Sequence, residues 1–256
     1  MDFALNEIQQ ELKQQAREWL ASRYPLDRDW EQQDDRWADL GELGWLDVAG
    51  ADLGFVEEAL LLEELGYALY PGPYLAHVTG QTDVFGSCGE LETVDPTRPL
   101  KRLPNGSAES PRLRAAMAAE AVGVAQRALD LGIEHAKSRM QFGKPIGQYQ
   151  AVSHQLADTY TDVELSRSLA YWAAWCVAQE DQKAPVAAAP AKAFATEAAV
   201  AACERSIQVH GGIGFTWEHA LHRFYKRALW LEGFGTRPSE LRLEVADAIL
   251  GAEVPA

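Results

Sequence analysis

Apolar residues recur every three to four positions along two stretches in the first third of the chain. In the first stretch these residues are Leu5, Ile8, Leu12, Ala16 and Leu20. In the second stretch, which is rich in Glu, they are Val56, Leu60, Leu61, Leu65 and Leu69. Such spacing gathers the apolar side chains on one face of an α-helix. Pro71-Gly72-Pro73 then breaks the pattern, so a helical domain is expected over residues 1–73.

The pattern changes over residues 74–110, which we interpret as a connector. This stretch is rich in Gly, Ser, Thr and Pro, and apolar residues alternate with polar ones only weakly, around Val94 and Leu100. A β-domain takes roughly 100 residues, which is far more than this stretch offers. We therefore expect a linking segment with a short hairpin.

Four further helices are expected after the connector. Ser110 can cap a helix and Pro111 suits its first position, so the first helix should run from there to about Ser138. The others are expected from about Gln150 to Cys176, from about Ala189 to Val209 and from about Ser239 to Leu250. Pro190 leaves the start of the third helix open. Four such helices are typical of an antiparallel bundle, which would span residues 111–256 and make the fold mainly α.

Charge and cysteine content exclude several kinds of partner. The formal net charge is -15, which repels nucleic acid and anionic membranes. Cys88, Cys176 and Cys203 are scattered, so neither a metal site nor a disulfide framework is expected. No apolar run approaches the length of a membrane span, and the acidic amino-terminal residues are unlike a signal peptide. A cytoplasmic protein is expected.

Two segments interrupt the helical pattern with residues that can bind a nucleotide. Residues 139–146 offer the cation of Arg139, the amide of Gln141, the ring of Phe142 and a bare backbone at Gly143. These are the groups that hold a diphosphate and stack on an adenine. The alternative is an interhelix turn with a solvated Arg and a Phe folded into the core, and spacing alone favours this alternative.

The second segment is Gln208-Val209-His210-Gly211-Gly212-Ile213-Gly214-Phe215-Thr216. Its glycines end a helix and let a ligand approach the backbone closely. The alternative is a plain helix C-cap, because Gly commonly ends helices. We expect His210 to be a packed or hydrogen-bonded histidine, not a base or a ligand.

Several motifs in one order make the chain similar to the acyl-CoA dehydrogenase family. They are Leu43-Gly44-Trp45-Leu46, Glu63-Glu64-Leu65-Gly66, residues 139–143, Leu156-Ala157-Asp158, Ala191-Lys192-Ala193-Phe194-Ala195, residues 208–216 and residues 221–227. Together they match the two helical domains of that family and cover nearly all of the chain except the connector. The family's β-rich middle domain has no counterpart in so short a connector.

The resemblance implies a shared flavin site. In that family each FAD lies at a subunit interface, with its ring on one subunit and its ADP end on the neighbour. By resemblance, Arg139, Gln141 and Phe142 would hold the diphosphate and the adenine. Gln208, Gly211 and Gly212 would line the same half-site, and Thr236 would add to it.

The resemblance also implies that this chain lacks a catalytic base. In most members a Glu just before a Gly-Thr removes the α proton of the acyl-CoA, but here Phe234 stands at that position. Other members carry the base at the start of the helix after the middle domain, where Leu113 stands. Glu232 and Glu120 lie nearby and are interpreted as solvated or paired surface carboxylates. No catalytic residue is therefore expected in this chain.

A subunit of a heteromeric acyl-CoA dehydrogenase fits these expectations best. Such enzymes oxidise bulky CoA esters, among them intermediates of steroid side-chain catabolism. The chain would share FAD with a full-length partner in an α2β2 heterotetramer that takes an acyl-CoA substrate. The alternatives are a flavin-independent, lyase-like enzyme that binds acyl-CoA on the same fold, and a structural subunit that stabilises a partner enzyme.

Overall fold

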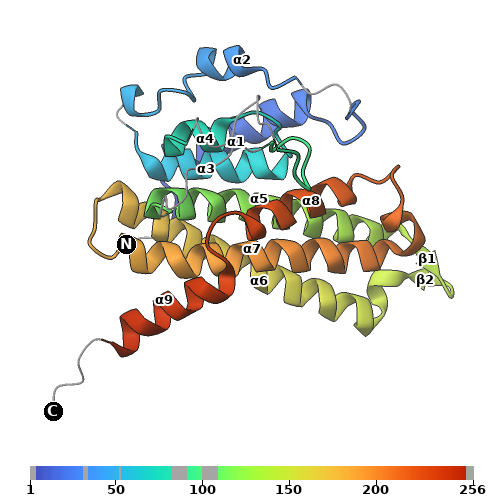
Figure 1. Cartoon of the computed structure of the whole chain (residues 1–256). Coiled ribbons are helices and arrows are strands. Elements are labelled where there is room, and N and C mark those ends of the chain that lie inside the picture. Colours follow the sequence, from blue (N-terminus) through green and yellow to red (C-terminus); the bar gives the residue numbers. More distant parts are fainter. Residues whose placement is uncertain (1–3, 31–33, 52, 82–90, 100–108, 252–256) are drawn as a thin grey trace.

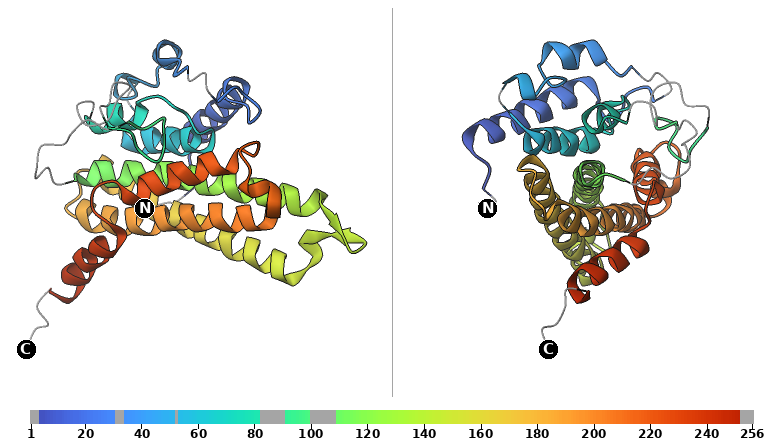
Figure 2. Two further views of the ribbon diagram at one scale, coloured as in Figure 1. Left: turned by 45° about the vertical axis from the view of Figure 1, so that its right-hand side comes forward. Right: turned by 60° about the vertical axis from the view of Figure 1, so that its left-hand side comes forward.

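A computed structural model shows two layers of helices, in which the amino-terminal helices lie over a bundle of longer ones (Figures 1 and 2). It describes residues 4–30, 34–51, 53–81, 91–99 and 109–251. The upper layer contains α1 (Glu7–Arg23), α2 (Trp37–Glu42), α3 (Phe55–Tyr67) and α4 (Tyr74–Thr79). The bundle contains α5 (Pro111–Ser138), α6 (Gln150–Ala178), α7 (Ala184–His210), α8 (Leu221–Gly233) and α9 (Pro238–Leu250). The mainly α prediction is confirmed.

The helices begin where local chemistry caps their free amide groups. Asn6 and Gln9 form a capping box at the start of α1, since each side chain accepts from the other's backbone. The Ser110 side chain accepts from the Leu113 amide at 3.1 Å, and Pro111 occupies the first turn of α5. The predicted start of α5 is therefore confirmed.

The two layers meet where α3 crosses α5, and the backbones touch there. A Cβ added to Gly123 on α5 would overlap the carbonyl oxygen of Glu63 and lie 2.7 Å from the amide nitrogen of Tyr67. A Cβ on Gly66 of α3 would in turn overlap the carbonyl oxygen of Glu120. The crossing thus requires glycine on both helices, because only glycine lacks the clashing atom.

The bundle differs from the prediction in two helices. Helix α7 begins at Ala184, earlier than predicted, and runs through Pro190. Pro190 lies in the second turn, where it removes one backbone hydrogen bond while the buried alanines around it still pack. Helix α8 was not predicted as a helix at all, so five helices follow the connector. Its buried Leu221, Phe224 and Leu231 recur at helical spacing among charged residues.

The short hairpin predicted for the connector stays a prediction, because about half of that stretch lies outside the described residues. The described part of the connector contributes α4, which buries Tyr74, Leu75 and Val78. Among the described residues the strands are β1 (Met140–Gln141) and β2 (Lys144–Pro145), which pair antiparallel between α5 and α6. Residues 82–90 and 100–108, with Cys88 and Leu100, lie outside the described residues.

Residues 93–99 of the connector are fixed to the bundle by buried charges. Arg227 on α8 pairs with Asp95 and with Glu120 on α5, and Arg98 reaches the same Glu120 carboxylate at 2.7 Å. Burial raises the pKa of Glu120, but the two guanidinium groups outweigh it and hold this pKa below its ordinary value. The interpretation of Glu120 as a surface carboxylate is wrong, because the residue is 1% exposed. It is paired, as expected, but inside the protein.

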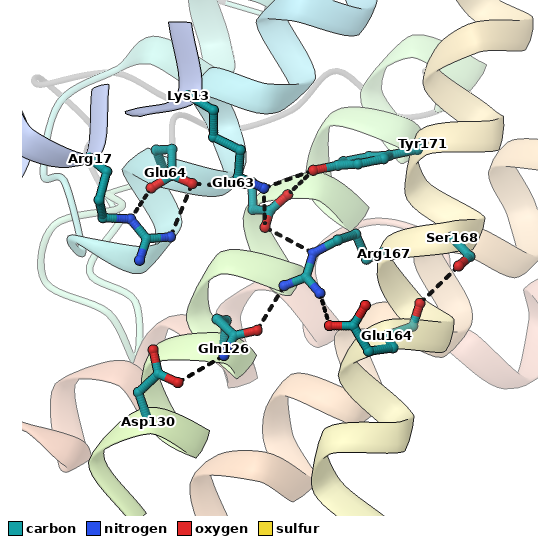
Figure 3. A network of polar contacts seen from close by, with 10 residues as sticks. All are labelled: Lys13, Arg17, Glu63, Glu64, Gln126, Asp130, Glu164, Arg167, Ser168 and Tyr171. Atoms are coloured by element: carbon teal, nitrogen blue, oxygen red, sulfur yellow. Dashed lines mark hydrogen bonds and ion pairs between the residues drawn. The ribbon is translucent and has the colours of Figure 1, made fainter. Parts of the chain in front are cut away.

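A second polar network joins the upper layer to α6 (Figure 3). Glu63 of α3 accepts from Lys13 of α1 at 2.8 Å, from Arg167 of α6 at 3.1 Å and from Tyr171 of α6 at 2.6 Å. Although burial disfavours the charged form of Glu63, the two cations hold its pKa below the ordinary value. The buried Glu63 carboxylate therefore connects α3 to α1 and α6.

The segment Ala184–Phe215, which contains α7, is long and apolar enough to cross a membrane by length and composition. We expected from the sequence that no apolar run would approach the length of a membrane span. This segment does, because its many alanines raise the mean hydropathy. In the structure, 67% of its most apolar window is buried among the other helices. The core helix of a soluble protein has the same properties, so this segment is weak evidence for a membrane span.

Candidate functional site: a half-site at one end of the bundle

A short hairpin projects from the end of the bundle between α5 and α6 (Figure 1). Its two turn residues, Phe142 and Gly143, have φ values of 50° and 82°. Positive φ at both positions is typical of a type I′ turn, which matches the twist of paired strands. The Ile146 amide also donates to the Arg139 carbonyl at 2.9 Å, which closes the base of the hairpin.

Phe142 stands at the tip of this hairpin and is 92% exposed. The alternative in which this ring folds into the core is therefore wrong. The ring touches only the edge of Tyr149 among the aromatic rings of the described chain, at 6.4 Å between centroids. A left-handed backbone costs a residue with a Cβ roughly 1–2 kcal/mol. The turn has this unfavourable backbone at Phe142, and the ring stays exposed to solvent, where a ligand can contact it.

Arg139 and Gln141 present their polar groups beside this ring. Both side chains are exposed. No carboxylate of the described residues lies within ion-pair distance of Arg139, and the Gln141 amide donates only to the neighbouring Met140 carbonyl, at 2.7 Å. A guanidinium and an amide so placed can bind phosphate oxygens.

The glycine-rich segment ends α7 at the same end of the bundle. Gly211 has a φ of 63°, as a helix-ending glycine often does, so the C-cap interpretation is confirmed. Yet Gly211 and Gly212 also leave open space, because a Cβ on either would meet nothing within 4 Å. Gly214 differs, since its Cβ would lie 2.6 Å from the Ile207 carbonyl oxygen. The exposed Gln208 lies one turn before Gly212.

Contacts between histidines bring the two segments together. The ring of His135 on α5 stacks on His210 of α7 with centroids 4.2 Å apart. The Arg139 amide donates to the His135 carbonyl at 2.8 Å, and His210 Nδ1 bonds to the Ser206 carbonyl at 2.7 Å. His210 is thus packed and hydrogen-bonded, as expected. The hairpin and the glycine turn therefore lie at the same end of the bundle, and we call their six predicted binding residues the half-site: Arg139, Gln141, Phe142, Gln208, Gly211 and Gly212.

The structure places Thr236 away from the other six residues, and its predicted part in cofactor binding stays a prediction. Its hydroxyl lies 3.5 Å from a guanidinium nitrogen of Arg114, in the first turn of α5. Arg139 directly follows the last residue of the same helix. At 1.5 Å per residue the two ends are roughly 38 Å apart. Sequence motifs cannot show this separation, because it depends on where the turn between α8 and α9 lies along the bundle.

The two positions of the family's base are apolar and buried. Leu113 and Phe234 are 4% and 8% exposed, and Phe234 stacks on Trp230 at 5.0 Å. Glu232 lies half-buried on α8, and burial together with Glu197 and Glu204 raises its pKa. No cation of the described residues lies within ion-pair distance of its carboxylate.

Sequence reasoning missed Glu109, whose carboxylate lies between these two positions. A Cβ added to Gly235 would overlap the Glu109 carboxylate. Both of its oxygens are engaged, one by the buried Lys192 and the other by Arg114 at 3.3 Å. Lys192 also donates to the carbonyls of Phe234 at 2.6 Å and Thr236 at 3.1 Å. Glu109 therefore serves as the counter-ion of a buried lysine, and no motif could have identified it.

The half-site fits the ADP end of FAD in its chemistry. It offers a cation, two amides, an exposed ring and two glycines whose backbone can approach a diphosphate. The described residues contain no β-domain on which a flavin ring could lie.

Comparisons with known families agree with this architecture. Residues 111–246 match the acyl-CoA dehydrogenase C-terminal domain, and residues 6–87 match the acyl-CoA dehydrogenase N-terminal domain. The acyl-CoA dehydrogenase IpdE2 of Mycobacterium tuberculosis is 41% identical over 150 residues, which cover 56% of this chain and 45% of that protein. The chain spans less than half the length of the curated relatives that it matches.

Solved structures share the fold at low sequence identity. The ChsE4-ChsE5 complex from Mycobacterium tuberculosis matches with a TM-score of 0.78 and 22% identity, over 100% of both chains. A variant of the Tcur3481-Tcur3483 steroid ACAD matches with a TM-score of 0.77 and 23% identity, over 97% of this chain and 99% of that one. With both helical domains matched in order, the chain belongs to the acyl-CoA dehydrogenase family.

Proposed function

We propose that this chain is a subunit of a heteromeric FAD-dependent acyl-CoA dehydrogenase, which introduces an α,β double bond into an acyl-CoA thioester. It lends the half-site across a subunit interface to a full-length partner. The partner supplies the site of the flavin ring and the catalytic Glu. The observation that carries the proposal is the contrast between an exposed, fully assembled half-site and two buried, apolar base positions.

Each residue of the half-site has a binding role in this proposal. The Arg139 guanidinium neutralises the diphosphate, and the amides of Gln141 and Gln208 donate to its oxygens or to the ribose. The Phe142 ring packs against the adenine. When bound, FAD would supply the hydride acceptor of the desaturation, and the partner's Glu would supply the base for the α proton. This chain holds the cofactor and moves no proton.

The relatives support an assembly of unlike chains. One solved structure of the same fold is a ChsE4-ChsE5 complex, and another is a Tcur3481-Tcur3483 steroid ACAD. Both names join two components, and one names a steroid. We therefore propose an α2β2 arrangement and a bulky CoA ester as the substrate class.

Co-expression with a full-length acyl-CoA dehydrogenase encoded nearby tests the proposal. The chain purified alone should be colourless or bind FAD weakly, whereas the complex should be yellow and active. Arg139→Ala should reduce the FAD retained per complex. Arg23→Ala is the matched control, because Arg23 is an exposed arginine at the end of α1, in the other layer. It should leave the flavin content unchanged.

Two outcomes would contradict the proposal in different ways. If Arg139→Ala combined with Gln208→Ala leaves both flavin content and activity of the complex unchanged, the chain is a structural subunit. If the isolated chain turns over an acyl-CoA without FAD, it is a flavin-independent enzyme.

A further inference from the structure

Three histidine rings from three elements meet behind the half-site. His135 lies in the last turn of α5, His210 is the last residue of α7, and His219 lies in the turn before α8. The His135 and His210 rings are 4.2 Å apart and the His210 and His219 rings are 4.4 Å apart. All three line one open cavity, together with Leu131 and Ile213. We call them the histidine cluster.

Hydrogen bonds fix whether Nδ1 carries a proton in two of these rings. His210 Nδ1 must donate, because its partner is the Ser206 carbonyl, at 2.7 Å. His219 Nδ1 must accept, because its partner is the Leu221 amide, at 3.3 Å. Leu221 is the first residue of α8, and Ala220 at the N-cap offers no side-chain acceptor. His219, one residue before the N-cap, therefore supplies the acceptor for the first free amide of α8.

We propose that the histidine cluster positions the half-site, with His219 joining the start of α8 to His210 on α7, and His210 in turn contacting His135 on α5. The turn carrying Gly211 and Gly212 lies between His210 and His219 in sequence. The hairpin carrying Arg139 starts one turn after His135. The cluster thus adds a contact between the two segments, beyond the packing of α5 against α7.

The cap works only while His219 is uncharged. A proton on its Nδ1 would set a donor against the Leu221 amide and place a positive charge at the N-terminus of α8, which is the unfavourable end. Cations predominate around the cluster, and the carboxylates beside it, Glu134 and Glu218, are both exposed, so solvent screens them. Arg139 lies beside His135, and His222, Arg223 and Lys226 follow on α8. Glu134 is the one carboxylate among the described residues that line the cavity.

The stability of this cap should therefore depend on pH. Burial first, and then the neighbouring histidines, lower the pKa of His219 to about 4 from an ordinary 6.5. Since the folded value is the lower one, the cap is fully stable above pH 6.5 and loses stability as the pH falls towards 4. Between pH 7.5 and pH 5, opening of this turn should become roughly 30-fold more favourable, if the open ring titrates at its ordinary value.

Hydrogen exchange of the full-length chain tests the proposal. The measured quantity is the protection factor of the Leu221 amide and its neighbours, which removes the intrinsic pH dependence of exchange. In the unaltered chain it should fall on the order of 30-fold from pH 7.5 to pH 5. His219→Asn keeps an acceptor that does not titrate, so it should reduce this fall, and His135 and His210, whose pKa values burial also lowers, should account for what remains. His154→Asn, on the exposed surface of α6, is the matched control and should behave like the unaltered chain.

A binding measurement separates this inference from the proposed function, on which its ligand rests. FAD is the probe, and the measured quantity is the FAD retained at both pH values by the chain co-expressed with its full-length partner. Weaker retention at pH 5 that is rescued by His219→Asn supports the positioning role. Equal pH dependence of protection in the unaltered chain and in His219→Asn overturns it. If protection behaves as expected but the complex retains no FAD at either pH, the cluster stands and the cofactor assignment fails.

Discussion

Replacing Gly123 by Ala would test how closely the two layers of the fold are joined. The new Cβ would lie 2.7 Å from the Tyr67 amide nitrogen and closer still to the Glu63 carbonyl oxygen, whereas ordinary contact begins at 3.4 Å. Helix α3 would therefore have to move by at least 3.4 − 2.7, or about 0.7 Å. The clashing atoms are backbone, so no side chain can rotate away.

The expected net effect is a loss of about 3 kcal/mol in the free energy of unfolding. A gap of 0.5–1 Å forfeits roughly a quarter to a half of the dispersion energy of each contact. Overpacking commonly costs about 1–3 kcal/mol and occasionally more. This site should lie at or above the top of that range because the backbone itself must shift. Alanine in place of glycine returns about 1 kcal/mol through helix propensity.

Thermal and urea unfolding of the full-length chain would measure this loss. At about 2–4 °C per kcal/mol for a chain of this size, the Tm should fall by roughly 6–12 °C. Gly233→Ala is the matched control, since its Cβ would meet nothing within 4 Å. It should leave the Tm nearly unchanged or slightly raised. Equal Tm values for the two variants would refute the backbone contact between α3 and α5.

Two further predictions concern the hairpin and the buried carboxylate. Phe142→Asn should raise the free energy of unfolding by up to about 1 kcal/mol, because Asn tolerates positive φ and the exposed ring buries nothing. The same change should lower FAD retention in the complex, and a large loss of stability in urea would show that the ring is packed. Glu63→Gln should cost about 3 kcal/mol at pH 7, since two cations lose their counter-ion. Because the pKa of Glu63 is lowered in the folded state, its stabilisation is present above the ordinary pKa and lost as the pH falls. Unfolding free energies between pH 7 and pH 3 should therefore fall less steeply in the variant, and equal slopes would contradict the ion pairs.

The sequence was most informative where structure depends on neighbouring residues. The caps at Asn6 and Ser110 and the apolar periods of α1, α3 and α5 act within one or two turns, so the printed sequence carries the whole cause. Helix α8 was missed although its period is clear, because its charged residues were considered only as part of a motif.

Features that depend on distant residues could not be predicted. Arg227 meets Asp95 across 132 positions of the chain, and Lys192 meets Glu109 across 83. Whether Phe142 points outward depends on the type of turn, which two strands impose together. The grouping of Arg139 with Gln208 was predicted by resemblance, and the histidine contacts explain it physically.

The crossing of α3 and α5 has a consequence for how the molecule can be divided. One family match ends at residue 87, inside the connector, and the other begins at residue 111, directly after it. The contact between the layers nevertheless places backbone against backbone and buries carboxylates between helices. The two matched parts therefore behave as one cooperative unit, and fragments made by cutting the connector would depend on each other to fold. Boundaries drawn by sequence families and boundaries of folding need not coincide.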